Sequence, residues 1–249
     1  AVVHADPRIS DVTSRIEELA SATNGFLTGG LTASRSRFAQ LAGEVDEGVI
    51  SGVMLSLHQV PVQLGLTQGC SPIGPTRTIT GAEQNVLFTI DNRPALEVLK
   101  EDIGEVLARD LRKIGGYIFA ALPVPGSDTA DYLVRNLTGI DQEAGAVAIG
   151  EMVNTGDRIM FCRRDPDTAV EDLKRMLNDL KRRAGGNPIK GGLYFSCVAR
   201  GPNQFGPESA ELGMIRDELG EFPLTGLFAN GEISNDRLYG YTGVLALFL

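Results

Sequence analysis

The sequence has no tryptophan, only two histidines and only three cysteines. Cys70, Cys162 and Cys197 are odd in number and none is spaced as a metal-binding pair, which excludes a disulfide framework and a zinc site of the usual spacing. Two histidines leave few candidates for a Ser–His or Cys–His catalytic pair. A Walker phosphate loop and a G-x-G-x-x-G turn are also missing. We therefore expect the thiols to be buried side chains in a reducing compartment.

Long hydrophobic runs and a signal peptide are absent as well. No stretch approaches the roughly 18 apolar residues of a membrane helix, and the first residues carry no basic segment. Asp and Glu outnumber Lys and Arg by 32 to 23, a net charge of −9, which argues against nucleic acid or an anionic membrane as partner. These features predict a cytoplasmic protein. The start without Met, directly in an apolar segment, predicts a fragment of a longer protein.

What the sequence has in excess is glycine, 30 of 249 residues, against a usual share of about 7%. Short apolar runs between turn formers predict strands, with 49–57 and 62–67 as neighbours and 132–140, 146–149 and 157–162 as an antiparallel meander. Amphipathic spacing predicts helices from Pro94 through Leu99, over 105–114 and, most clearly, over 168–184. Together they predict a mixed α/β (α+β) fold with antiparallel-rich sheets and flanking helices, a layered αββα-like sandwich being one arrangement.

Glycine and proline gather in loops that follow predicted strands, over residues 67–75, 195–207 and 228–234. Glycine lets backbone N–H groups approach a ligand, and the neighbouring Ser, Asn and Gln side chains supply neutral hydrogen bonds. Arg200 and Glu232 add one charge of each sign. Such a pair suits a zwitterion, with Arg200 on its carboxylate and Glu232 on its ammonium group. The alternative is a structural ion pair, with Gly and Pro serving only to make turns.

The same loops resemble a known family. Residues 29–32, 68–75 and 91–95 are similar to the N-terminal part of the FIST family, and residues 192–197, 200–201, 228–233 and 239–248 to its C-terminal domain. The most specific motifs are S-C-x-x-R-G and N-G-E-I, which occur in this order. The resemblance implies an N-terminal FIST domain over residues 1–102, lacking its start, and a C-terminal FIST domain over residues 103–249.

The resemblance also implies a function: a bacterial sensory domain that binds a small ligand, an amino acid or related metabolite, for signal transduction through a partner protein. No catalytic residue, metal or cofactor is assigned, and the oligomeric state stays open. Three alternatives remain: an enzyme with Cys70 or Cys197 as nucleophile, a protein-interaction adaptor, and a haem-binding sensor with His4 or His58 as ligand. The candidate ligand-binding residues are Gly29, Gly30, Gln68, Gly69, Cys70, Ser71, Ser196, Cys197, Arg200, Gly201, Asn230 and Glu232.

Overall fold

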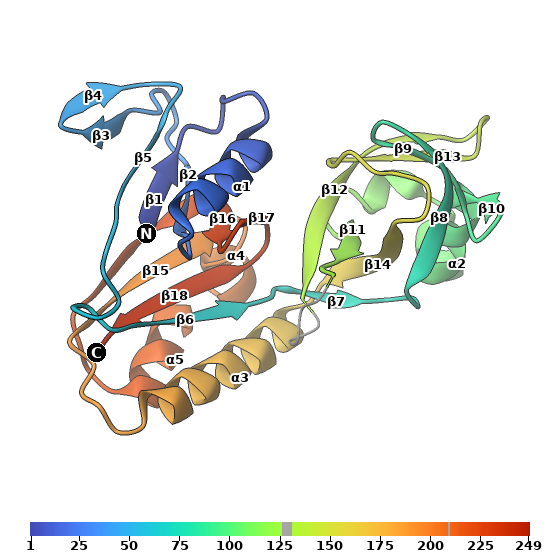
Figure 1. Cartoon of the computed structure of the whole chain (residues 1–249). Helices are drawn as coiled ribbons and strands as arrows, with labels where there is room; N and C mark the ends of the chain where they lie inside the picture. The colour runs from blue at the N-terminus through green and yellow to red at the C-terminus, as the bar shows by residue number, and fades with distance from the viewer. Residues whose placement is uncertain (126–130, 209) are drawn as a thin grey trace. The chain divides into compact units, whose positions relative to one another are not determined.

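The computed structural model of the chain describes residues 1–125, 131–208 and 210–249, and it divides into two compact units (Figure 1). Unit 1 combines Ala1–Gly69 with Pro166–Leu249, and unit 2 is Cys70–Asp165. Each unit is built on a sheet with mostly antiparallel pairs, so the mixed α/β class is confirmed. The layered sandwich and the boundary near residue 102 stay predictions.

The sheet of unit 1 has the strand order β5-β1-β2-β16-β15-β18-β6, with β17 paired to β16. Only β1–β2 and β15–β16 are parallel pairs among these strands. The strands are β1 (Val2–Ala5), β2 (Thr28–Thr32), β5 (Ile50–Val53), β6 (Val62–Thr67), β15 (Gly191–Cys197), β16 (Leu224–Ser234), β17 (Arg237–Tyr239) and β18 (Gly243–Phe248). A separate hairpin joins β3 (Gln40–Ala42) to β4 (Glu44–Asp46).

The expected pairing of segments 49–57 and 62–67 is wrong. β5 and β6 lie at opposite ends of this sheet, because β5 pairs with β1 near the N-terminus and β6 with β18 at the C-terminus. Their spacing in the sequence is typical of a hairpin, but each strand instead pairs with a strand that is distant in the sequence.

Among the residues that the structure describes, the helices that accompany this sheet are α1 (Val12–Thr23), α3 (Pro166–Ala184), α4 (Pro202–Phe205) and α5 (Ala210–Leu219). Helix α1 buries Ile16 and Ala20 against β1 and Ile233 of β16. The apolar stripe of α3, predicted from the sequence, packs on Tyr194 of β15, on β18 and on Ile215 of α5. Three basic residues in its last turn complement the helix dipole.

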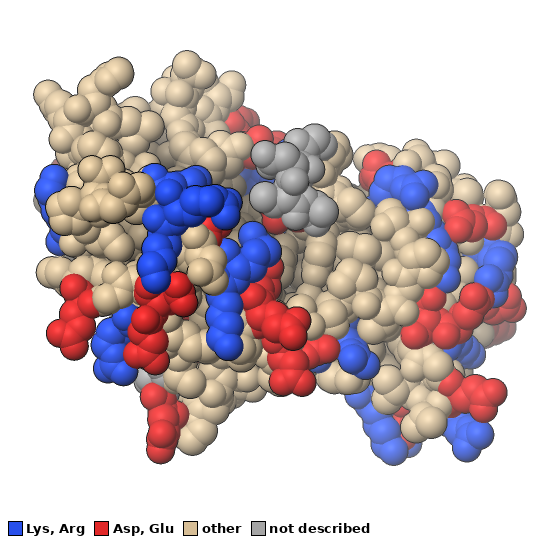
Figure 2. Space-filling model, turned by 90° about the horizontal axis from the view of Figure 1, so that it is seen from below, with Lys and Arg blue, Asp and Glu red and all other residues tan. Residues whose placement is uncertain are grey.

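Figure 2 views the molecule from below, the side on which α3 and α5 lie in Figure 1. Acidic and basic side chains are interspersed across this face. Along α3 this follows from pairs three or four residues apart, such as Asp172 with Arg175 and Asp179 with Arg183. Exposed pairs of this kind contribute little stability, but they prevent a patch of single sign.

Unit 2 is a closed antiparallel barrel. Its pairings run β8-β9-β13-β12-β11-β14 and return to β8, with β7 and β10 added at β14 and β9. Its strands are β7 (Cys70–Pro72), β8 (Arg77–Glu83), β9 (Val86–Ile90), β10 (Arg93–Pro94), β11 (Ile118–Pro123), β12 (Tyr132–Asp141), β13 (Ala146–Ile149) and β14 (Arg158–Arg164). The predicted meander is therefore only partly correct: β12 and β13 pair, but β14 pairs with β11, because closure requires it there.

Helix α2 (Ala95–Ala108) packs its buried face, including Leu96 and Leu99, into the barrel core. The two helices expected in this region are the two pieces of α2, which is broken at the non-helical residue Gly104; the second piece ends at Ala108, and a 3-10 turn follows over Leu111–Lys113. Gly104 has φ of 76°, which glycine adopts at little cost, so the break falls there. Across the described residues, no helix is both long and apolar enough to cross a membrane.

Candidate ligand pocket

Unit 1 contains a pocket of about 360 Å³ between β15, β16 and the helices α4 and α5. Its polar lining consists mainly of the side chains of Tyr194, Ser196 and Glu211. Its walls are mostly apolar, and they include the whole run of β16 from Leu224 to Phe228. The remaining lining residues are Gly201, Pro202 and Leu212. A small cavity with apolar walls and a few convergent polar groups is typical of a ligand site.

A buried ion pair forms the polar end of the pocket. Tyr194 Oη donates to Glu211 Oε1 at 2.6 Å, and Ser196 Oγ donates to Glu211 Oε2 at 3.1 Å. The Arg200 Nε and Nη2 atoms lie 2.9 and 2.8 Å from Glu211 Oε1. Arg200 is 0% exposed and Glu211 3%, so both charges are out of water and compensate each other. Burial, together with the Glu211 charge, raises the pKa of the Tyr194 hydroxyl, which therefore stays protonated and keeps donating.

The surroundings hold Arg200 in one position. Its guanidinium lies over the Phe205 ring, 5.0 Å from the centroid. Gly69 lies beside it, and the Gly69 carbonyl accepts from Gln204 Nε2 at 2.6 Å. A Cβ at position 69 would lie 2.6 Å from the Tyr241 carbonyl oxygen, so only glycine fits. Gly69 thus supports the cluster through its backbone.

Glu232 belongs to a second buried cluster, on β16 beyond a bulge. Its Oε2 accepts from the Thr242 hydroxyl at 2.7 Å and from the Thr242 N–H at 3.2 Å. Burial raises the pKa of Glu232 to about 8, against the lowering effect of the Thr242 bonds and the Arg200 charge. The neighbouring Cys197 thiol has its pKa raised to about 12, first by burial and then by the Glu232 charge. A thiol with so high a pKa is a poor nucleophile at neutral pH.

The structure brings some of the predicted residues together and not others. Ser196 and Gly201 line the pocket, and Arg200 lies directly behind it. Arg200 does not form the ion pair with Glu232 that the structural alternative expects; its ion-pair partner is Glu211. Asn230 is exposed on β16, away from the pocket lining.

Other predicted residues have structural roles. The Gln68 N–H donates to Asp172 of α3 at 2.7 Å. A Cβ at Gly29 would overlap the Val3 carbonyl of β1, and one at Gly30 would come within 2.6 Å of the Ala229 Cβ. These glycines therefore let strands approach closely, and they do not line the pocket.

Cys70 and Ser71 belong to unit 2, on β7, and unit 1 holds the pocket. The Ser71 hydroxyl donates to Asp165 at 3.2 Å. Cys70 and Cys162 are both buried, and the hydrogen bond with Cys70, followed by burial, raises the pKa of the Cys162 thiol. All three cysteines are free and buried, as the sequence predicts.

Sequence reasoning missed Tyr194, Glu211 and the β16 run. Two signals were available. Tyr194 precedes Ser196 by two residues on a strand, so both side chains lie on one face. Glu211 and Ile215 lie four apart within a helix, so the spacing alone places the carboxylate on the same face as an apolar side chain.

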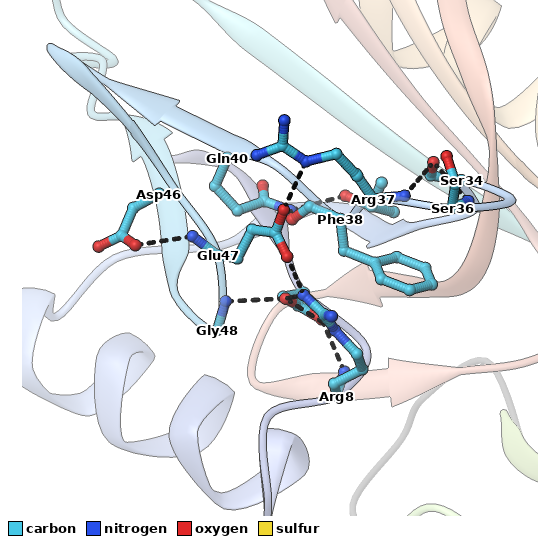
Figure 3. Close-up of polar contacts among 11 residues, drawn as sticks. Arg8, Ser34, Ser36, Arg37, Phe38, Gln40, Asp46, Glu47 and Gly48 are labelled. Carbon is cyan, nitrogen blue, oxygen red and sulfur yellow. Dashed lines mark hydrogen bonds and ion pairs between the residues drawn. The ribbon is translucent and has the colours of Figure 1, made fainter.

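A further polar cluster lies at the end of β1 (Figure 3). Buried Asp6 accepts from Arg8 Nη2 at 2.7 Å and from the Gly48 N–H at 2.7 Å. Arg8 also contacts Glu47, which in turn pairs with Arg37. These contacts fasten the β3–β4 segment to β1. Outside residues 126–130 and 209, no group of three or more His, Cys, Asp or Glu could hold a metal.

Two family models match the chain: the FIST N domain over residues 1–93 and the FIST C domain over residues 95–235. An uncharacterised protein of Mycobacterium tuberculosis is 34% identical over 92% of this chain and 61% of its own length. An uncharacterised protein of Mycobacterium bovis is 32% identical, over 92% of this chain and 60% of its own length. An F-box/LRR-repeat protein of Arabidopsis thaliana is 27% identical over 46% of this chain and 20% of its own length. The chain thus spans about three fifths of the length of its mycobacterial relatives.

Proposed function

Because the chain belongs to the FIST family, whose domains are sensory modules of signal transduction, we propose that it is the ligand-sensing part of a bacterial cytoplasmic signalling protein. The ligand is an amino acid or a related small metabolite, and it binds in the pocket of unit 1. A partner protein receives the signal.

The observation that carries this proposal is the polar cluster at the end of an apolar pocket. The volume of about 360 Å³ lies at the small end of the range for ligand sites, which suits a molecule the size of an amino acid. The hydroxyls of Tyr194 and Ser196 point their protons at Glu211, so their lone pairs are left for a ligand. The walls accept an apolar side chain.

This geometry reverses the orientation expected from the sequence. The guanidinium of Arg200 is fully buried and held by Glu211, so it supports the cluster and does not receive the ligand carboxylate. Glu211 and Ser196 line the pocket, and their side-chain oxygens are acceptors that suit an ammonium group. The ligand carboxylate then needs N–H donors, which we assign to backbone groups of β16, because its residues Leu224–Phe228 line the pocket.

A cysteine-dependent enzyme fits less well. Cys197, the cysteine of unit 1, has its pKa raised to about 12, and the pKa of the Cys162 thiol is raised as well. A haem sensor would need His4 or His58 as the iron ligand. The His4 ring already packs edge-on against Phe195, with 5.9 Å between the ring centroids, and burial lowers the pKa of the His4 imidazole, so this side chain has a packing role in unit 1.

Calorimetric titration with each of the twenty amino acids tests the proposal. Leu212→Arg places a long charged side chain at the pocket rim, where Leu212 is 48% exposed, so the fold should tolerate it. We expect one or more amino acids to bind, with affinity at least tenfold lower in this variant. Val106→Arg is the matched control, because Val106 is 82% exposed on α2 of unit 2. Folded protein that binds none of the twenty would refute a free amino acid as the ligand, and equal binding by L212R would refute the pocket of unit 1 as its site.

A further inference from the structure

One half of β16 has no partner strand on one side. Strand β15 pairs with Leu224–Ala229, whereas β2 reaches only from Ser234 to Ala229 on the other side. The residues from Leu224 to Phe228 therefore form an open edge in the described part of the chain. The same five residues line the pocket. The open edge and the pocket are one site.

The hydrogen-bonding groups of this edge follow from the strand pattern. The carbonyls of Pro223 and Ala229 accept from Gly192 and Val198, so they face β15. Successive residues of a strand direct their N–H and C=O groups to opposite sides, so Leu224, Gly226 and Phe228 direct theirs outward. In the described part of the chain, no strand pairs with Leu224 or Gly226 on that side, whereas the Phe228 carbonyl is used by the Ala229–Thr32 pairing with β2, because the groups of Ala229 itself face β15. The N–H and C=O pairs of Leu224 and Gly226 and the Phe228 N–H thus remain at this edge, more than a free amino acid can satisfy.

Acidic side chains line a second hollow next to the pocket. A second hollow shares Leu212 and Leu224 with the pocket, and its lining includes Glu208, Glu221 and Arg216. Arg216 is paired with Asp217 at 3.4 Å. Within the described residues Glu208 and Glu221 have no ion-pair partner, and both are exposed. The groove is therefore apolar at one end and negatively charged at the other.

We infer that the ligand of this site is a short extended peptide that adds to β16 as a strand, places a large apolar side chain in the pocket and directs a basic residue to Glu208 and Glu221. Main-chain hydrogen bonds along an open edge supply affinity, and side-chain pockets supply specificity. The inference rests on the proposed function, because it names the ligand class of the same site.

Fluorescence anisotropy on the full chain provides the test, with a fluorescein-labelled probe peptide, Thr-Val-Phe-Val-Thr-Lys, and its counterpart with Lys at the other end. We expect one of the two to bind, and an analogue N-methylated at alternate amides to bind at least tenfold more weakly. Phe228→Ala should weaken binding at least tenfold, and Phe88→Ala, which alters a similarly exposed ring in unit 2, should not. Glu221→Gln should weaken binding about threefold, and Glu105→Gln on α2 should leave it unchanged.

Four outcomes overturn the inference. The first is that free phenylalanine binds but neither peptide does, in which case the proposed function survives. The second is that the methylated analogue binds as tightly as its parent peptide, which would show that no strand forms. The third is that sedimentation shows a dimer that F228A dissociates, which would show that a second copy occupies the edge. The fourth is that neither peptide nor any amino acid binds the folded protein, in which case the proposed function fails as well.

Discussion

Removing either charge of the Arg200–Glu211 pair should destabilise unit 1 strongly, whereas removing both should cost far less than the sum. Arg200→Met keeps most of the side-chain volume but leaves the Glu211 carboxylate buried without its cation. Glu211→Gln keeps the acceptor for Tyr194 and leaves the Arg200 guanidinium buried without its anion. Breaking a buried pair in this way costs about 3–5 kcal/mol, because the remaining charge is uncompensated.

The double variant R200M/E211Q contains no buried charge at this site. It loses the contact of the guanidinium with the Phe205 ring, worth about 1–2 kcal/mol, but the amide of residue 211 still accepts from the Tyr194 hydroxyl. We therefore expect its loss of stability to be at least about 2 kcal/mol smaller than the sum of the single losses.

Urea unfolding followed by far-UV circular dichroism measures these free energies, since the chain has no tryptophan to report on unfolding. Hydrogen exchange of β15 and α5 peptides assigns the loss to unit 1, with β11 of unit 2 as the reference. Additive losses, within about 0.5 kcal/mol, would refute the reasoning, because they would mean that the two charges do not compensate each other.

Three further predictions concern residues that do not line the pocket. The pKa of Glu232 is raised from 4.5 to about 8, so folding favours its protonated form, and the free energy of unfolding should fall by on the order of a few kcal/mol as the pH rises from 5 to 8. Glu232→Gln should flatten this pH dependence, measured as the midpoint of urea unfolding at each pH. An unchanged slope in the variant would contradict the prediction. Asp6→Asn removes the charge that holds Arg8 while keeping the side-chain shape, so limited proteolysis within residues 33–49 should accelerate severalfold; an unchanged cleavage rate would show that the cluster does not fasten this segment. Gly29→Ala forces a Cβ onto the Val3 carbonyl and should cost about 1–3 kcal/mol, whereas Gly115→Ala, where the Cβ meets open space, should be neutral in the same assay.

The sequence predicts local structure well where the pattern is strong. The stripe of α3 contains Leu173, Leu177 and Leu180, all buried, and the 3.6-residue period is enough to find it. Strand pairing is not local, so the separation of β5 from β6 and the closure of the barrel by β8 could not be predicted from spacing. The break at Gly104, by contrast, could be predicted from the sequence, because the expected helices end at Leu99 and begin again at Glu105.

The candidate site was predicted in part for a similar reason. One motif, S-C-x-x-R-G, contains Ser196, Arg200 and Gly201. A motif of this kind marks the loop at the end of a strand, so these residues could be assigned to the site from the sequence. Glu211 comes from a helix, and neither its spacing from Arg200 nor its residue type distinguishes it from an ordinary solvated acid. The sequence therefore points to Glu232, the acid in the nearest recognisable motif, as the opposite charge to Arg200, although the Glu232 carboxyl is bonded to Thr242.

The cost of the buried pair bears on what the cluster does. Two charges taken out of water contribute little net stability, and apolar residues of the same volume often replace such a pair without loss. Arg200 and Glu211 are thus better explained by the position they impose than by the energy they supply. They orient the hydroxyls of Tyr194 and Ser196 toward Glu211 and leave those oxygens as acceptors at the end of an apolar pocket. Such fixed dipoles need no rearrangement when a ligand arrives, so the affinity is not reduced by ordering these side chains. On this argument R200M should weaken amino-acid or peptide binding even at a temperature where the variant remains folded.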